Sequence, residues 1–340
     1  MTATLNDNLL RDRLTPAADL KVGELRRSDE AAAPRNAALH RTPEALNIEA
    51  VILLAGSVRR NELVEATGRA RLDLPLDERE TVLNQWQRQT ADWLKSAGQG
   101  ERPLRVLIDR VAPVLPRSAV AIPGAPLSIE TDPQECRGTG GLLRDLAVDF
   151  DDESWLLVAT GAQVLLEPLA ALVVRLSAVE GDVRLLAHAD GTPVGIMLVR
   201  CGCLRKLDRI GFVDMKEQAL PRIAKSHRVG VVMCNNPTSL PLLTYRDYLR
   251  AMRQCHLRRS NPQVLHDPFA EDWRCGFGVI EPGAQIDGSV HLHDSVVLRA
   301  ARVEAGATVV RSVVCSGAVI KRNQVVIDQL VEPHGASSRA

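Results

Sequence analysis

The stretch AVILLAGSVRR, residues 50–60, decides the fold. Its residues 51–55 form a run of apolar side chains without polar interruption, and the run ends at Gly56. A short apolar run closed by glycine is typical of a strand buried on both faces of a parallel sheet. Arg59 and Arg60 follow in the loop, at the carboxyl end of the strand, where open α/β sheets bind ligands. Cationic side chains there suit a phosphate, and a solvated loop after a core strand explains them equally well.

Composition limits the class of protein. The 340 residues are enough for two domains, one of them with a large core. The 42 basic residues balance the 42 acidic ones, so bulk charge favours neither a nucleic-acid nor a membrane-surface partner. No signal peptide opens the chain, and no apolar run approaches the roughly 18 residues of a membrane span. We therefore expect a cytoplasmic protein that does not cross a membrane.

Cysteine usage fits a reducing compartment. The seven cysteines are scattered, odd in number and without the spacing of a disulfide framework. Cys201 and Cys203 stand two apart, which is not a zinc-knuckle spacing. We expect buried free thiols.

Strands and helices alternate over residues 48–260. The apolar runs at 104–108 and 154–160 predict further strands, and 80–94 reads as a helix whose Trp86 and Trp93 lie on the apolar face. Residues 190–191, Asp-Gly, predict a hairpin. This alternation predicts an α/β domain of the Rossmann-like kind, with a mixed, mostly parallel sheet sandwiched by helices. Residues 1–47 are broken by prolines, and we expect a flexible N-terminal arm.

The C-terminal part has another period. Ile280, Ile286, Leu292 and Leu298 recur every six residues, and the period continues at Val303 after a slip of one residue. A six-residue repeat predicts a short left-handed parallel β-helix, which we place at 275–328 and estimate at about two turns. Because such a coil cannot bury its own ends, it should cap on the α/β domain or on another subunit. Residues 329–340 then form a disordered tail.

Several stretches, in order over residues 48–327, resemble motifs of the sugar-nucleotidyltransferases, the NDP-sugar pyrophosphorylases. AVILLAG is similar to the first strand and the start of the family's phosphate loop. The other matches are RLDLPL (71–76) with K-P-L-L-P-V, RGTGGLLRDL (137–146) with L-G-T-A-G-A-L-R, DGTPVGIMLVR (190–200) with N-A-G-I-Y, FVDMKEQALPRI (212–223) with D-x-K-E, and TYRDYLRAM (244–252) with T-P-E-D-Y-L-x-A.

This resemblance implies phosphoryl transfer, in which a sugar 1-phosphate attacks the α-phosphate of a nucleoside triphosphate and pyrophosphate leaves. Positioning and charge neutralisation do most of that chemistry, with a divalent metal held by carboxylates. The matching motifs imply that Arg59, Arg60 and Arg71 are the catalytic cations. The residues implied in binding a nucleotide or sugar nucleotide are Gly56, Ser57, Gly138, Thr139, Gly140, Gly141, Gly161, Gly195 and Lys216.

Departures from the family pattern fall on the metal site. The metal-binding aspartate of the family's N-G-D aligns with Ala162, and the second metal aspartate falls near Pro241. The loop after Gly56 also lacks a second glycine, which makes it harder to wrap a triphosphate. Losing the metal alone removes several kcal/mol from transition-state stabilisation. Among nearby carboxylates, we consider only Glu167 as a replacement, because Asp149, Asp151 and Asp152 precede their strand and should lie at its wrong end.

Three functions follow from these observations. The first is a divergent, catalytically impaired member, in effect a pseudoenzyme, which binds a nucleotide or NDP-sugar or serves as a scaffold or regulatory subunit in carbohydrate (exopolysaccharide) biosynthesis. The second is an active pyrophosphorylase with relocated catalytic groups, and only this one calls for Mg²⁺. The third is a hexapeptide acyltransferase with His291 or His293 as base. The resemblance also implies a homo-oligomer formed through the β-helix.

Overall fold

The computed structural model describes residues 46–56, 61–110, 112–115, 122–131, 137–260 and 276–333. The predicted N-terminal arm lies outside the described residues apart from its last two, and so does most of the predicted tail.

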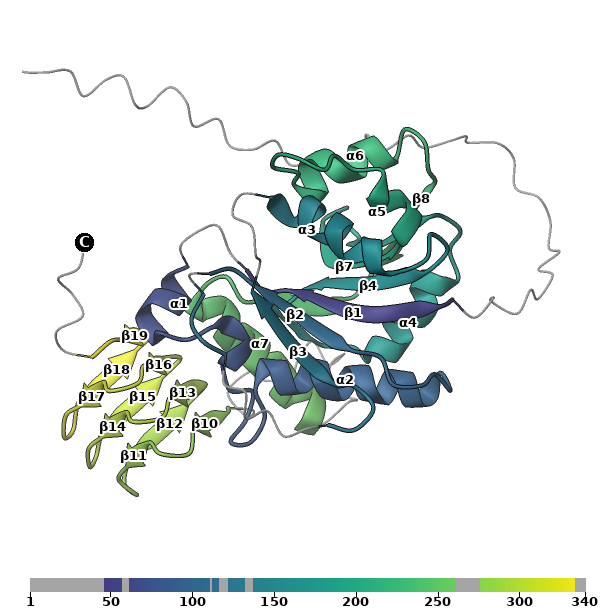
Figure 1. Cartoon of the computed structure of the whole chain (residues 1–340). Helices are drawn as coiled ribbons and strands as arrows, with labels where there is room; N and C mark the ends of the chain where they lie inside the picture. The colour runs from purple at the N-terminus through teal and green to yellow at the C-terminus, as the bar shows by residue number, and fades with distance from the viewer. Residues whose placement is uncertain are drawn as a thin grey trace, which may run out of the picture.

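A seven-stranded sheet forms the centre of the α/β domain, in the order β3-β2-β1-β4-β7-β6-β8 (Figure 1). The strand β1 pairs in parallel with both of its neighbours, and β7 is the antiparallel member, between β4 and β6. The predicted mixed, mostly parallel sheet is therefore confirmed. The strands are β1 Ile48–Leu54, β2 Leu104–Ile108, β3 Leu127–Thr131, β4 Trp155–Thr160, β6 Val183–His188, β7 Pro193–Arg200 and β8 Val229–Cys234.

Strand β1 has its side chains in two separate cores. Val51 and Leu53 belong to one core and Ala50 and Ile52 to the other, and none of the four is exposed. This is the burial on both faces that the uninterrupted apolar run predicts. The helices covering the first face are α2 Val82–Ser96, α4 Leu169–Ser177 and α7 Tyr245–Ser260, and those on the second are α3 Gly138–Leu146, α5 Cys201–Arg205 and α6 Leu220–Ile223 (Figure 1).

Local chemistry sets where the helices begin. Helix α2 starts two residues later than predicted, because Thr81 and Asn84 form a reciprocal capping box at its amino end.

Both tryptophans of α2 are core residues, as predicted, with Trp86 unexposed and its indole donating to the Gln163 carbonyl at 3.1 Å. The predicted hairpin at 190–191 is also confirmed. The smaller elements are α1 Glu62–Thr67, η2 Arg71–Asp73, η3 Ala147–Asp149, η4 Met215–Ala219, β5 Gln163–Leu165 and β9 Ser239–Pro241.

The C-terminal strands build three parallel sheets. In each ladder a residue pairs with the residue 17 positions later, as Val296 does with Val313. One sheet holds β10 Gly278–Ile280, β13 Ser295–Val297, β16 Val313–Val314 and β19 Leu330–Val331; the second holds β11 Gln285–Ile286, β14 Arg302–Val303 and β17 Val319–Ile320; the third holds β12 His291–His293, β15 Thr308–Val310 and β18 Val325–Ile327.

The six-residue period is therefore only a local approximation. Because the true repeat is 17 residues, Val297 and not Leu298 lies in the core of the C-terminal strands, whereas Leu298 packs in the cluster of the α/β domain. Ile280 pairs with Val297 and keeps the position that the six-residue count predicts, although it is 37% exposed on the first strand. The chain also passes the three sheets three times, not about twice, and β19 extends the first ladder beyond the predicted boundary at residue 328.

The C-terminal strands share a core with the α/β domain. Val279, Val296 and Leu298 belong to the same apolar cluster as Leu72 and Tyr248. Next to it lies a buried ion cluster that joins the two parts. Its members are Arg69, Asp73, Glu281 and Arg299, and the first three are each 8% exposed.

Arg69 is the centre of this ion cluster. Its guanidinium donates to Asp73 Oδ2 at 2.7 Å and, with two nitrogens, to both oxygens of Glu281 at 2.6 and 3.0 Å. Burial alone would lower the pKa of Arg69, but the bonds to the two carboxylates outweigh it and the pKa is raised. The bidentate geometry orients the C-terminal strands as well as attaching them.

Replacing Arg69 with methionine should lower the free energy of unfolding by about 3–5 kcal/mol, because it leaves two buried carboxylates short of a cation. Urea unfolding monitored by tryptophan fluorescence measures this. Arg228→Met is the matched control, since Arg228 pairs with Glu180 on the surface, where such pairs contribute less than about 1 kcal/mol. Equal losses for the two variants would contradict the central role of Arg69.

Candidate functional site

Three loops meet at the carboxyl edge of the parallel strands. Gly56 follows β1, Asp109 follows β2 and Gly161 follows β4, and the parallel registers bring these ends together. The Gly161 N–H donates to the Leu54 carbonyl at 2.9 Å, and a Cβ on Gly56 would lie only 3.3 Å from the Asp109 backbone nitrogen. Both glycines thus permit a close approach of backbone, at the place where the sequence predicts the ligand.

A cation and a carboxylate lie within electrostatic reach of each other at this edge. Arg71, on η2, is partly buried, and this burial lowers the pKa of its guanidinium, while the charge of Asp109 acts in the opposite direction. Sequence reasoning missed Asp109. Its place in the sequence could have revealed it. Asp109 comes directly after the LRVLI strand, and polar residues at that end of a parallel strand lie at the edge where ligands bind.

The structure brings together Ala162 and Pro241, the two positions that the sequence resemblance aligns with metal aspartates. The antiparallel pair of β5 and β9 sets Gln163 opposite Pro241, and the Leu242 N–H donates to the Ala162 carbonyl at 2.8 Å. Ala162 is 5% exposed and Leu242 is not exposed at all. A methyl group, a pyrrolidine ring and an aliphatic chain offer Mg²⁺ no carboxylate oxygen, so these residues do not fit the metal.

A fourth strand, β7, reaches this edge at Gly195. Its φ of +80° lies in the left-handed region, and a Cβ on it would lie 3.0 Å from Thr160 Oγ1 at the end of β4. An irregularity in the β6–β7 register falls at the same place. The structure therefore sets Gly195 beside Thr160, the residue before Gly161.

The residues Gly138 to Gly141 form the first turn of α3 and not a free loop. The N–H groups of Gly140 and Gly141 donate to the Val213 carbonyl at 2.8 and 3.4 Å, and Thr139 Oγ1 accepts from the Met215 N–H at 3.0 Å. These groups are already committed to the chain itself, which weakens the prediction that they receive a ligand. They do bring Lys216 of η4, whose side chain is exposed, next to α3.

The remaining predicted residues have varied outcomes. Ser57, Arg59 and Arg60 lie outside the described residues. Glu167 forms an ion pair with Arg175, so it is not a free replacement for a metal ligand.

The amino-edge carboxylates lie as predicted: Asp152 pairs with Arg205 at 2.7 Å, at the opposite end of β4. The five cysteines within the described residues, Cys201, Cys203, Cys234, Cys255 and Cys315, are free and buried, as predicted. None of the described helices is both long and apolar enough to span a bilayer.

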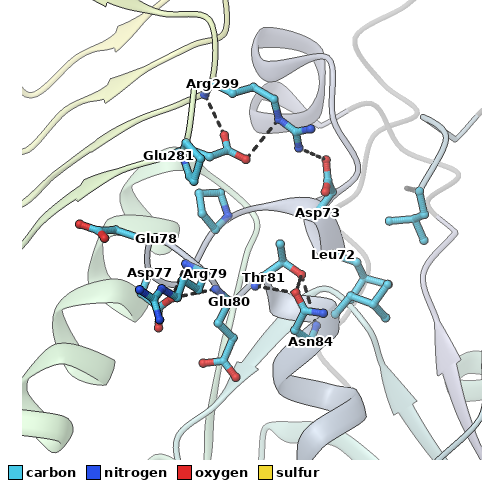
Figure 2. Close-up of a pocket in the computed structure, with 14 residues that line it drawn as sticks. Leu72, Asp73, Asp77, Glu78, Arg79, Glu80, Thr81, Asn84, Glu281 and Arg299 are labelled. Atoms are coloured by element: carbon cyan, nitrogen blue, oxygen red, sulfur yellow. Dashed lines mark hydrogen bonds and ion pairs between the residues drawn. The ribbon is translucent and has the colours of Figure 1, made fainter. Parts of the chain in front are cut away.

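A cavity of about 280 Å³ lies elsewhere, between the segment 72–84 and the C-terminal strands (Figure 2). Figure 2 shows the carboxylates of Asp73 and Glu281 beside Arg299 on one side, and Thr81 with Asn84 on the other. Sequence reasoning missed it, because its walls come from segments about 200 residues apart. Leu72 separates the cavity from the strand edge: it lines the cavity, and its Cδ1 lies 3.5 Å from where a Cβ on Gly161 would be.

Comparisons with known proteins give distant likenesses. No family model matches the chain, and no curated protein matches it. The solved structure of HddC from Yersinia pseudotuberculosis is similar with a TM-score of 0.44 and 12% identity, over 61% of this chain and 100% of that one. Rv0371c from Mycobacterium tuberculosis H37Rv has a TM-score of 0.40 and 20% identity over 61% and 97%, and its homologue from Mycobacterium sp. strain JC1 has 0.40 and 18% over 62% and 98%.

Gly138→Ala should destabilise the fold, because the new Cβ would lie 2.4 Å from the Val213 carbonyl oxygen at a φ of +71°. We expect a loss of about 1–3 kcal/mol in denaturant unfolding. Gly100→Ala is the control, since nothing lies within 4 Å of its Cβ position and its φ is ordinary. A stable Gly138→Ala variant would mean that the approach of residue 213 to α3 is looser than described.

Proposed function

We propose that this chain is a divergent sugar-nucleotidyltransferase-like protein that binds a nucleotide or NDP-sugar at the carboxyl edge of β1, β2 and β4 without efficient catalysis. The observation that carries the proposal is the β5–β9 pair: it joins the positions of Ala162 and Pro241, and neither supplies a carboxylate. The protein then acts as a binding, scaffold or regulatory subunit in carbohydrate (exopolysaccharide) biosynthesis.

Loss of the metal affects catalysis more than binding, because the metal neutralises charge in the transition state. A metal contributes several kcal/mol by neutralising the phosphates, and each 1.36 kcal/mol corresponds to about a factor of ten in rate. Binding a diphosphate in the ground state needs less neutralisation of charge, because one or two cations with backbone N–H donors are enough. Arg71 and Lys216 are such cations, and the side chain of Lys216 is exposed.

The second candidate is an active pyrophosphorylase with relocated groups, and Asp109 is the observation in its favour. It puts a carboxylate beside Arg71 at the expected edge. In this alternative Arg59, Arg60, Arg71 and Lys216 act as phosphate clamps and Mg²⁺ is required. No described contact favours the acyltransferase, since His291 and His293 flank Leu292 in β12 and are not directed at a cavity that the structure describes.

We also propose that the three C-terminal sheets are the sides of a left-handed β-helix, through which two copies of the chain associate in the cytoplasm. The repeat of 17 residues and the three strands in each repeat support the β-helix. Exposed Val319, Val325 and Ile327 on the last repeat support association.

An assay for pyrophosphate release, with Mg²⁺ and panels of nucleoside triphosphates and sugar 1-phosphates, should show no turnover, because no carboxylate stands at residue 162 or 241. Release with any pair would favour the second candidate. Asp109→Asn then identifies the relocated group, and it should abolish that release if Asp109 holds the metal.

Titration calorimetry with a panel of NDP-sugars should detect binding that Arg71→Ala weakens by about 10- to 100-fold, as expected for the loss of a charge-assisted contact. Arg79→Ala is the matched control. Arg79 is exposed at the rim of the interdomain cavity, on the other side of Leu72. If Arg79→Ala weakens binding and Arg71→Ala does not, the ligand occupies the cavity and the proposed site is wrong.

A further inference from the structure

A second group of chemically reactive side chains lies on the opposite edge of the sheet. Asp182, Cys203 and His227 each offer one ligand atom, and these atoms lie within 4.8 Å of one another. Asp182 directly precedes β6, Cys203 lies in α5 just after β7, and His227 lies two residues before β8. Because β6 runs parallel to β4, the start of β6 lies at the amino edge, away from the proposed nucleotide site.

The spacing within this group suits a shared ion better than a direct bond. His227 Nδ1 lies 3.5 Å from Asp182 Oδ2. A charge-assisted hydrogen bond between such groups is about 2.7–2.9 Å long. Two ligands held by bonds of about 2.0 Å at a tetrahedral zinc ion lie about 3.3 Å apart. The observed separation is therefore close to that of two ligands of one metal ion.

The three side chains are held by their surroundings. Asp182 receives the Arg200 guanidinium at 3.0 Å on Oδ1 and the Arg228 backbone N–H at 3.2 Å on Oδ2. Its backbone is fixed between the same two residues, with its N–H donating to the Arg228 carbonyl at 2.8 Å. Cys203 is 1% exposed within a helix. Such outer contacts orient metal ligands before the ion arrives.

A lysine occupies the outer side of the group. The Lys206 ammonium lies 3.1 Å from His227 Nε2, and since an ammonium can only donate, Nε2 is the acceptor. Lys206 is exposed on a flexible stem, so it can move away. In the absence of a metal it supplies positive charge next to the imidazole and so competes with an incoming cation.

We propose that Asp182, Cys203 and His227 bind a zinc ion, with water in the fourth position. A thiolate, an imidazole and a carboxylate are the donor set that zinc prefers. Binding converts the Cys203 thiol to a thiolate, forms the Zn–S bond and releases the thiol proton to solvent. Because Nε2 accepts from Lys206 in the metal-free state, the neutral imidazole of His227 carries its proton on Nδ1. When Nδ1 binds zinc, that proton is lost to solvent, Nε2 takes up a proton in its place, and Lys206 moves away. The ion ties together the segments before β6 and β8 and the end of β7, and it is separate from the nucleotide site.

The test is a titration of the full-length, metal-stripped protein with Co²⁺, followed by absorption spectroscopy. We expect one equivalent to bind, with the charge-transfer band of a cobalt–thiolate bond and the visible bands of tetrahedral Co²⁺, and Zn²⁺ should displace it. Cys203→Ser should abolish the charge-transfer band. Cys255→Ser, another buried free thiol, is the matched control and should retain it.

Lys206→Ala keeps the proposal testable if Cys203→Ser does not fold, because Lys206 is on the surface. Removing the competing cation should tighten Co²⁺ binding about tenfold, the scale of an outer-contact effect, and His227→Gln should weaken binding at least as much. Absence of the thiolate band in the wild-type protein, or its persistence in Cys203→Ser or His227→Gln, would overturn the proposal. Lys206 would then be the permanent cation of an internal ion group.

Discussion

The bidentate contact between Arg69 and Glu281 is the constraint on which the arrangement of this molecule depends. It crosses from the α/β domain to the C-terminal strands, and Asp73 and Arg299 complete it. Buried ion pairs of this kind contribute less to stability than their Coulomb energy implies, because both partners are desolvated. Their geometry is nevertheless demanding, and a planar guanidinium accepts few alternative positions.

That geometry extends to the proposed ligand edge through three consecutive residues. On η2, Asp73 is a member of the ion cluster, Leu72 packs beside Gly161, and Arg71 lies within the electrostatic reach of Asp109. Docking of the C-terminal strands thus fixes the position of the cation that we assign to the phosphate. The same segment forms one wall of the interdomain cavity, which places the two candidate ligand sites on either side of one leucine.

Much of the α/β domain was predictable, because its strands are continuous apolar runs whose burial leaves little ambiguity. The uninterrupted run of β1 correctly predicted a strand with both faces buried. The importance of Ala162 and Pro241 could be predicted only through the resemblance. Their proximity could not be predicted, because it depends on the pairing of β5 with β9. The six-residue period incorrectly placed Leu298, in place of Val297, in the core of the C-terminal strands, because the corner residues make each repeat one residue short of three hexapeptides.

Other features depend on tertiary contacts that no local pattern encodes. The turn at Gly138 satisfies its backbone donors with Val213, about 75 residues away, so its glycines serve close packing. The cavity at Glu281 and the group around Cys203 combine residues from distant segments. Sequence spacing predicts sites within one element and fails where several elements contribute one residue each.

We infer that the carboxyl edge binds a nucleotide diphosphate beside Arg71 without a metal. The most direct test is a crystal structure of the full chain grown with an NDP-sugar and Mn²⁺, with anomalous scattering used to locate the metal. We predict the diphosphate next to Arg71 and no Mn²⁺ peak between Ala162 and Pro241. A Mn²⁺ ion held there, by Asp109 or by any other carboxylate, or a ligand found in the cavity at Arg299, would contradict the account.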